Sequence, residues 1–172
     1  MNNKVIVSQT VFFALYVILQ VFVAKYLELF DVAFCFLYIN FIFNLPHDTK
    51  HEFLLLLGFV MGFVIDSFYN TWGIQSAACV FIAFARPFII KILTPKNAGE
   101  ESEIRDMGFL RFGLYALILT FLHHSIIFFL EVAHFKYFFS TVVKIFFSTI
   151  FTLVIIIIIQ YLSPKKATKA HE

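Results

Sequence analysis

The chain has 172 residues, of which 61% are apolar and 14% are charged, and its formal net charge is +2. With a mean hydropathy of +0.89, this composition excludes an ordinary soluble domain and is typical of a membrane protein. The net charge is too small to indicate a nucleic-acid partner. Because a helix needs roughly 20 apolar residues to cross the hydrocarbon core, we expect a single all-α membrane domain over residues 1–172, a bundle of about six transmembrane helices.

Residues 5–23 form the first apolar segment, which contains no charged side chain. No small-residue cleavage pattern follows it, so we interpret it as a retained helix and not as a signal peptide. Residues 29–45 form the second segment, which contains Asn40 and Asn44 and ends before a proline. We expect a second helix here, and because the uncharged part is short, a tilted or re-entrant segment is the alternative.

A helical hairpin follows. Residues 53–69 and 72–93 are both strongly apolar, and the polar and glycine side chains of residues 70–73 predict a tight turn between them. Gly58 and Gly62 have G-x-x-x-G spacing, which places both on one face of the first helix, where another helix can approach closely. That neighbour belongs either to the same chain or to a partner.

The last two predicted helices cover residues 112–131 and 137–162. A loop of mixed charge, residues 94–111, precedes them, and a tail over residues 163–172 follows. With the N-terminus inside, lysine and arginine are concentrated in the loops and tails on the cytoplasmic side. The positive-inside rule therefore predicts that both termini are cytoplasmic.

Three ionisable side chains fall inside predicted helices: Asp66, Arg86 and Lys144. An ionised group near the bilayer centre costs at least ~2.5 kcal/mol unless it pairs, extends to the interface or faces water. Asp66 and Lys144 both lie near the outer ends of their helices, so they are placed to form an ion pair, although Asp66 can instead face the periplasmic interface. Arg86 either extends toward the cytoplasmic interface or, beside a kink at Pro87, borders a cavity.

The fifth helix contains His123 and His124, and Glu131 and His134 lie near its outer end. Such residues raise the possibility of a metal site or a proton relay. Adjacent histidines point about 100° apart on a helix, which disfavours chelation of one metal ion. The sequence also has no Gly-rich phosphate loop, no paired catalytic carboxylates and no nucleophile beside a base. We therefore expect no metal, no cofactor and no enzymatic activity.

Residues 58–87 resemble the central hairpin of the MreD family of rod shape-determining membrane proteins. The resemblance rests on glycines in the first helix, an aspartate near its end, a glycine opening the next helix and an Arg-Pro pair further along. These features map to Gly58, Gly62, Asp66, Gly73, Arg86 and Pro87. Many relatives have a histidine shortly after the second-helix glycine, whereas this chain has Gln75, which forms hydrogen bonds but does not titrate near neutrality.

The resemblance implies a non-enzymatic scaffold or regulator of peptidoglycan synthesis during cell elongation, located in the bacterial inner membrane. MreD-like proteins work with MreC, the actin-like MreB, RodA and the elongation-specific penicillin-binding transpeptidase, so the expected function is maintenance of rod shape by binding MreC. The family's helix bundle is similar to the substrate-binding subunits of energy-coupling-factor transporters. The alternative is therefore a small-molecule-binding transporter subunit, in which a polar cavity is lined by Trp72, Gln75, Asp66 and Lys144. The candidate partner-binding or cavity residues are Gly58, Gly62, Asp66, Trp72, Gly73, Gln75, Arg86, Pro87 and Lys144.

Overall fold

The structure is a computed structural model that describes residues 3–94, 108–132 and 135–162 of the chain. Most of the predicted loop over residues 94–111, and all of the predicted tail over residues 163–172, lie outside the described residues. Within the described part, five helices are long and apolar enough to cross a membrane, so the chain has the architecture of a multi-pass helical membrane protein. These helices are α1 (Asn3–Phe22), α3 (His51–Tyr69), α4 (Ile74–Leu93), α5 (Phe109–Val132) and α6 (Phe138–Leu162).

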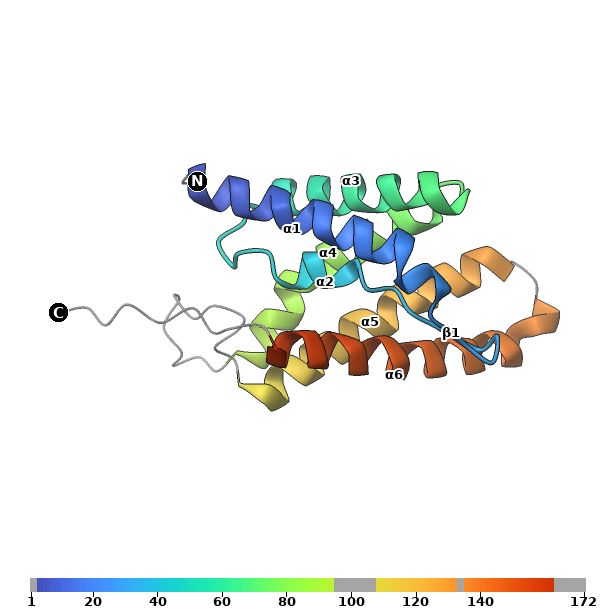
Figure 1. The fold of residues 1–172 in the computed structure, drawn as a ribbon. Helices are drawn as coiled ribbons and strands as arrows, with labels where there is room; N and C mark the ends of the chain where they lie inside the picture. Colours follow the sequence, from blue (N-terminus) through green and yellow to red (C-terminus); the bar gives the residue numbers. More distant parts are fainter. Residues whose placement is uncertain (1–2, 95–107, 133–134, 163–172) are drawn as a thin grey trace.

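The helices run along one long axis of the molecule (Figure 1). α3 and α4 form one antiparallel pair, α5 and α6 form another, and α4 packs against α5 to join the two pairs. We call one end of the bundle the hairpin end, because the turn between α3 and α4 lies there. The other is the terminal end, where α1 begins and α6 ends (Figure 1).

The glycines of α3 lie in its contact with α4. A Cβ atom added to Gly62 would lie only 2.6 Å from the carbonyl oxygen of Gln75, and one added to Gly58 would lie 3.0 Å from that of Cys79. Both neighbours are backbone atoms of α4, so the two helices are as close as their backbones permit. The G-x-x-x-G face is therefore covered by α4 of the same chain and is not open to a partner.

Residues 27–50 do not form the predicted second helix. Two short strands, β1 (Glu28–Leu29) and β2 (Ala33–Phe34), pair antiparallel, and the only helix in this part is α2 (Ile39–Phe43). The prediction of a helix over residues 29–45 is therefore wrong. We call residues 27–50 the crossing segment, since the chain runs here from the hairpin end to the terminal end (Figure 1).

The strands of the crossing segment are joined by a tight turn. Phe30 and Asp31 both have positive φ, at 54° and 56°, and the backbone N–H of Val32 donates to the carbonyl oxygen of Leu29 at 3.1 Å. Two consecutive positive φ angles are the signature of the type I′ turn, which matches the twist of a β-hairpin. The Phe30 side chain at its tip is 94% exposed.

An irregular backbone is compatible with this position because the crossing segment is enclosed by the helices. Every residue from 35 to 43 is buried. Non-helical backbone at membrane depth is tolerated only where protein, and not lipid, surrounds it, because each unpaired N–H or C=O in hydrocarbon costs several kcal/mol. The crossing segment therefore needs hydrogen-bond partners on the surrounding helices.

Gln20 of α1 is the first such partner. Its side-chain oxygen accepts hydrogen bonds from the backbone N–H groups of Leu37, at 2.6 Å, and Tyr38, at 3.3 Å. Its amide nitrogen donates to the carbonyl oxygen of Cys35 at 3.1 Å. One buried side chain thus satisfies three backbone groups that a helix would have paired internally.

Two hydroxyl groups of α6 form hydrogen bonds with the backbone of the crossing segment near the start of its buried part. Ser148 Oγ accepts from the backbone N–H of Phe34 at 2.9 Å. One turn further along α6, Thr152 Oγ1 accepts from the N–H of Phe36 and donates to the carbonyl oxygen of Phe34, both at 3.2 Å. The crossing segment is consequently fixed between α1 and α6.

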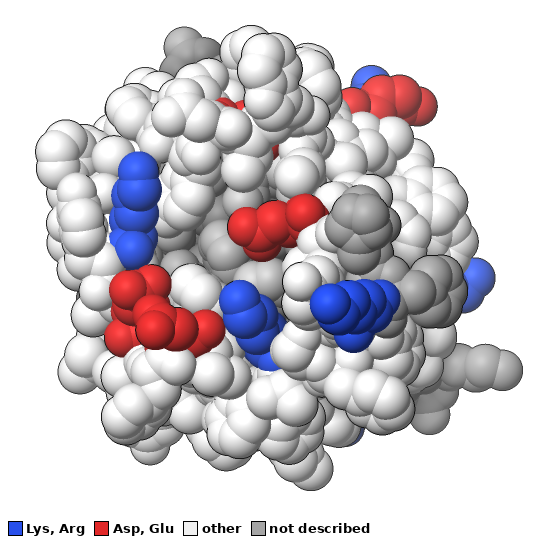
Figure 2. Space-filling model, turned by 90° about the vertical axis from the view of Figure 1, so that its right-hand side faces the viewer, with Lys and Arg blue, Asp and Glu red and all other residues white. Residues whose placement is uncertain are grey.

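The hairpin end carries exposed charges of both signs. Lys25 and Glu28 lie where α1 passes into the crossing segment, and Glu131 and Lys136 lie near the connection between α5 and α6. Figure 2 views the molecule from this end and shows basic and acidic groups interspersed, with neither sign dominating. Because such charges are costly in hydrocarbon, we expect this end to lie at a membrane surface.

Candidate functional site

Asp66, near the end of α3, caps the N-terminus of α4. One carboxylate oxygen accepts from the hydroxyl of Thr71 at 2.6 Å and from the backbone N–H of Gln75 at 3.0 Å. The other accepts from the N–H and the hydroxyl of Ser76, at 2.9 and 2.6 Å. A carboxylate at this position satisfies N–H groups that have no intrahelical partner and complements the positive end of the helix dipole.

The turn predicted at residues 70–73 is present between the two helices. Asn70 and Gly73 have positive φ, at 54° and 85°, a conformation that favours asparagine and glycine. Between them, the Trp72 side chain is fully exposed. The turn therefore projects an indole ring from the hairpin end, next to the buried Asp66.

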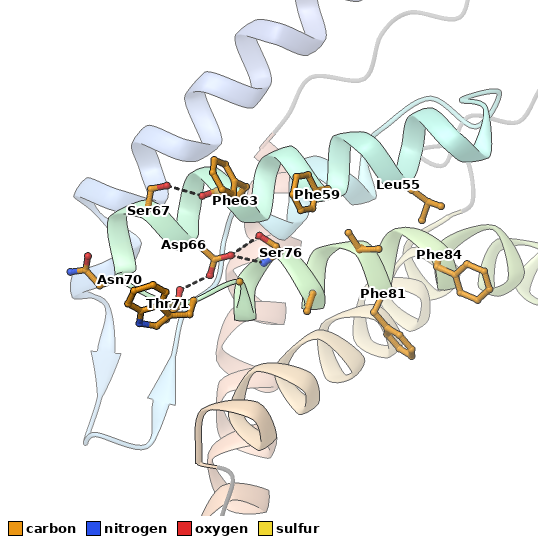
Figure 3. Close-up of a pocket in the computed structure, with 14 residues that line it drawn as sticks. Leu55, Phe59, Phe63, Asp66, Ser67, Asn70, Thr71, Ser76, Phe81 and Phe84 are labelled. Atoms are coloured by element: carbon orange, nitrogen blue, oxygen red, sulfur yellow. Dashed lines mark hydrogen bonds between the residues drawn. The ribbon is translucent and has the colours of Figure 1, made fainter.

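A groove of about 1010 Å³ runs along the outer face of α3 and α4 (Figure 3). Phenylalanines of both helices form its walls, and in α3 the rings of Phe59 and Phe63 stack with their centroids 5.9 Å apart. Small side chains of α4, among them the buried Ser76 and the exposed Ala77, also line the groove. The lining residues are Leu55, Phe59, Phe63, Asp66, Ser67, Asn70, Thr71, Trp72, Gly73, Ser76, Ala77, Val80, Phe81 and Phe84.

The groove brings together only part of the set predicted from the sequence. Asp66, Trp72 and Gly73 line it. The expected pairing of Asp66 with Lys144 is not formed, because all four hydrogen bonds of Asp66 come from Thr71 and α4, whereas the Lys144 ammonium lies over the ring of Phe34, 5.4 Å from its centroid. The remaining predicted residues lie inside the bundle or elsewhere on its surface.

Of the two alternatives for Arg86, extension to the interface is not observed. Arg86 is 2% exposed, and its Nε donates to the hydroxyl of Tyr115 at 3.1 Å, while its Nη2 donates to the carbonyl oxygen of Leu45. The Tyr115 hydroxyl in turn donates to the carbonyl oxygen of Phe43 at 3.2 Å. Arg86 therefore stabilises the carbonyl-rich end of α2 within the crossing segment. Pro87 follows it, and α4 nevertheless continues to Leu93.

Gln75 is buried and is not among the residues that line the groove. The hydroxyl of Tyr38, in the crossing segment, donates to Gln75 Oε1 and lies 2.8 Å from Nε2 of His123. Because the single hydroxyl hydrogen goes to Gln75, His123 Nε2 is the donor to Tyr38, and Nδ1 of His123 has no partner in the described part of the chain. These three side chains connect α4, the crossing segment and α5.

The neighbouring histidine makes separate contacts. His124 Nδ1 lies 2.7 Å from the carbonyl oxygen of Thr120, and its Nε2 lies 3.3 Å from Thr152 Oγ1. The two histidines thus use different partners, as their angular separation on the helix predicts. No group of three or more histidine, cysteine or acidic residues able to hold a metal occurs among the described residues, which do not include His134.

The side chains that fix the crossing segment are not among the residues predicted from the sequence. One signal was available, since each of them is an isolated polar residue in an apolar stretch and buried polar groups need partners. The partners themselves carry no sequence signal, because many of them are backbone atoms. The overlooked residues are Gln20, Tyr38, Tyr115, Ser148 and Thr152.

Comparison of the chain with protein-family models, with curated proteins and with solved structures yields no match. The resemblance of residues 58–87 to the MreD family therefore stays a prediction from the sequence.

Proposed function

We propose that this chain is a non-catalytic membrane scaffold of the complex that builds peptidoglycan during cell elongation, and that it maintains rod shape by binding MreC. RodA, the elongation-specific transpeptidase and MreB are the further partners in this proposal. One structural observation supports it most directly. The segment that resembles MreD folds into the α3–α4 hairpin. Its two helices pack closely against each other at the glycines of α3, and its outer face has an open groove.

The proposed location is the bacterial inner membrane, with both termini cytoplasmic. The crossing segment supports this topology, because it adds one passage along the bundle to those of the five long helices and brings the start of α1 and the end of α6 to the same end. The terminal end is then cytoplasmic and the hairpin end is periplasmic. Trp72 lies in the turn between α3 and α4, so this residue and the β1–β2 hairpin, at the same end of the bundle, face the periplasm in this orientation.

The interior of the bundle favours a scaffold over a transporter subunit. Of the four residues proposed to line a ligand cavity, Asp66 and Trp72 border the outer groove, Gln75 is bonded inside the core and Lys144 lies against Phe34. They do not converge on one space. The crossing segment, hydrogen-bonded to side chains of four helices, occupies the centre of the bundle where a ligand would have to bind.

Isolation of the protein from its host in mild detergent, after crosslinking in intact cells, tests this function. We expect MreC, and with it RodA, to be recovered above the level obtained from an untagged strain. Recovery of energy-coupling ATPase subunits together with a bound small molecule would instead identify a transporter subunit. Absence of MreC and RodA from crosslinked material that contains the inserted protein would refute the scaffold function.

A further inference from the structure

The shape of the α3–α4 groove suits a helix. It extends from Leu55 to Asn70 along α3, which at 1.5 Å per residue is about 22 Å, or four turns. This length covers most of a hydrocarbon core of about 30 Å. Helices associate in lipid chiefly through close packing, which small residues at the contact permit, and the lining of the groove includes the small side chains of Ser76 and Ala77 as well as phenylalanines.

Among the described residues, no cation pairs with the carboxylate at the hairpin end of the groove. Asp66 lines the groove, and its hydrogen-bond donors in the described structure, which belong to Thr71, Gln75 and Ser76, are all uncharged. Lys25, at the same end of the bundle, donates instead to the carbonyl oxygen of Phe68 at 3.1 Å. Intramembrane carboxylates usually pair with an opposite charge, so a basic side chain entering the groove would complement Asp66.

We infer that the α3–α4 groove holds one membrane-spanning helix of a single-pass protein, and that this helix carries a lysine or arginine at the depth of Asp66. The inference rests on the proposed scaffold function and names the surface through which the scaffold binds. An acyl chain fills the apolar part of the groove but offers no group to Asp66, whereas a helix supplies both an apolar face and a positioned charge.

Photo-crosslinking in cells that express the full chain tests the groove. A photoreactive amino acid replaces Phe63 or Ala77, which line the groove, or Phe147, a control on α6 that is also exposed. We expect Phe63 and Ala77 positions to yield an adduct with one single-pass protein and the Phe147 position to yield none. The crosslinked peptide should lie in its membrane helix, which should contain a basic residue near the outer end.

A blocking variant tests the fit. Ala77→Phe adds a ring to the lining of the groove, and Val142→Phe adds the same ring to the exposed face of α6, at a similar distance from the hairpin end. With equal amounts of inserted protein, Ala77→Phe should reduce the adduct from position 63 about tenfold, the effect of about 1.4 kcal/mol. Val142→Phe should leave it unchanged.

Each alternative occupant gives a different result. Adducts with lipid alone, or a crosslinked dimer of this chain, overturn the inference. Recovery of MreC without any groove adduct also overturns it, and leaves the scaffold function in place. A groove adduct with a single-pass protein outside the elongation complex supports the docking surface, and it refutes the scaffold function when MreC and RodA are also absent from the crosslinked material.

Discussion

The side-chain oxygen of Gln20 lies 2.6 Å from the backbone nitrogen of Leu37, across the interface between α1 and the crossing segment. The same oxygen also accepts from the N–H of Tyr38. In a regular helix, carbonyl groups four residues earlier would have bonded these N–H groups. A single amide on α1 therefore replaces part of the missing helix, and it couples α1 to a stretch of chain that has no internal pairing of its own.

Replacing Gln20 by leucine should destabilise the bundle. The side chain keeps a similar size, but the N–H groups of Leu37 and Tyr38 lose their partner, and each buried orphaned group costs about 1–3 kcal/mol. We expect Gln20→Leu to lower the free energy of unfolding in mixed micelles by about 2–6 kcal/mol. The control is Gln160→Leu on α6, which is half-buried. Equal stability of the two variants would contradict the role assigned to Gln20.

The loss of stability caused by replacing each glycine with alanine should depend on the space around that glycine. A methyl group at Gly62 meets backbone atoms of Gln75 and Ser76, one at Gly58 is at the limit of contact, and one at Gly113 of α5 meets nothing within 4 Å. Gly62→Ala should therefore separate α3 from α4 and cost about 1–3 kcal/mol, as overpacking does. Gly58→Ala should cost less, and Gly113→Ala should be neutral or stabilising. Unfolding in denaturing detergent measures the order, and any other ranking would contradict the close contact.

Most of the fold was predictable from the sequence because each long helix requires an uninterrupted apolar stretch. The helix predicted over residues 112–131 is Phe109–Val132 in the structure, and the one predicted over residues 72–93 is Ile74–Leu93. The crossing segment was not predictable in this way. Its central part, residues 32–45, is as apolar as a helix, and its backbone is irregular only because side chains distant in the sequence satisfy it.

The candidate site was predictable in part. The turn at residues 70–73 and the importance of Asp66 follow from local sequence, since a carboxylate before such a turn can reach the next helix. The groove depends on which helix faces remain uncovered, and a sequence does not specify this. The contacts of Arg86 were missed for a related reason, because one of its partners is the carbonyl oxygen of Leu45, which any residue would provide.

Arg86 and Tyr115 should be energetically coupled. Both donate to carbonyl groups of the crossing segment, and Arg86 also donates to the Tyr115 hydroxyl. Each of Arg86→Met and Tyr115→Phe should destabilise the protein, and the double variant should be less destabilised than the sum by about 0.5–3 kcal/mol. A double-mutant cycle in mixed micelles measures the coupling. Additive effects would show that the two side chains act independently.

Cysteine labelling should place the two ends of the crossing segment on opposite sides of the membrane. Cys35 and Cys79 are buried, so the native thiols should resist a membrane-impermeant maleimide. We expect a cysteine at Phe30 to react from outside intact cells, because this side chain is exposed at the hairpin end. A cysteine at Asp48, exposed beyond α2, should react only after the membrane is opened. Labelling of both positions from one side would mean that the segment turns back without crossing.

Trp72 is the only tryptophan of the chain, so its fluorescence reports on one place, the rim of the groove at the hairpin end. In vesicles that contain the protein alone, lipids brominated close to the head group should quench it more than lipids brominated at mid-chain. Tryptophan favours the interfacial region, and this residue lies at the end of the helices, in the α3–α4 turn.

A single-pass partner in the groove should displace lipid from one side of the indole of Trp72 and reduce the quenching, provided that the partner helix itself lacks tryptophan. The variant Ala77→Phe, with a ring added to the groove lining, should show the same quenching with this partner as without it. If the partner reduces the quenching of Trp72 equally in Ala77→Phe and in the native chain, it binds somewhere other than the groove.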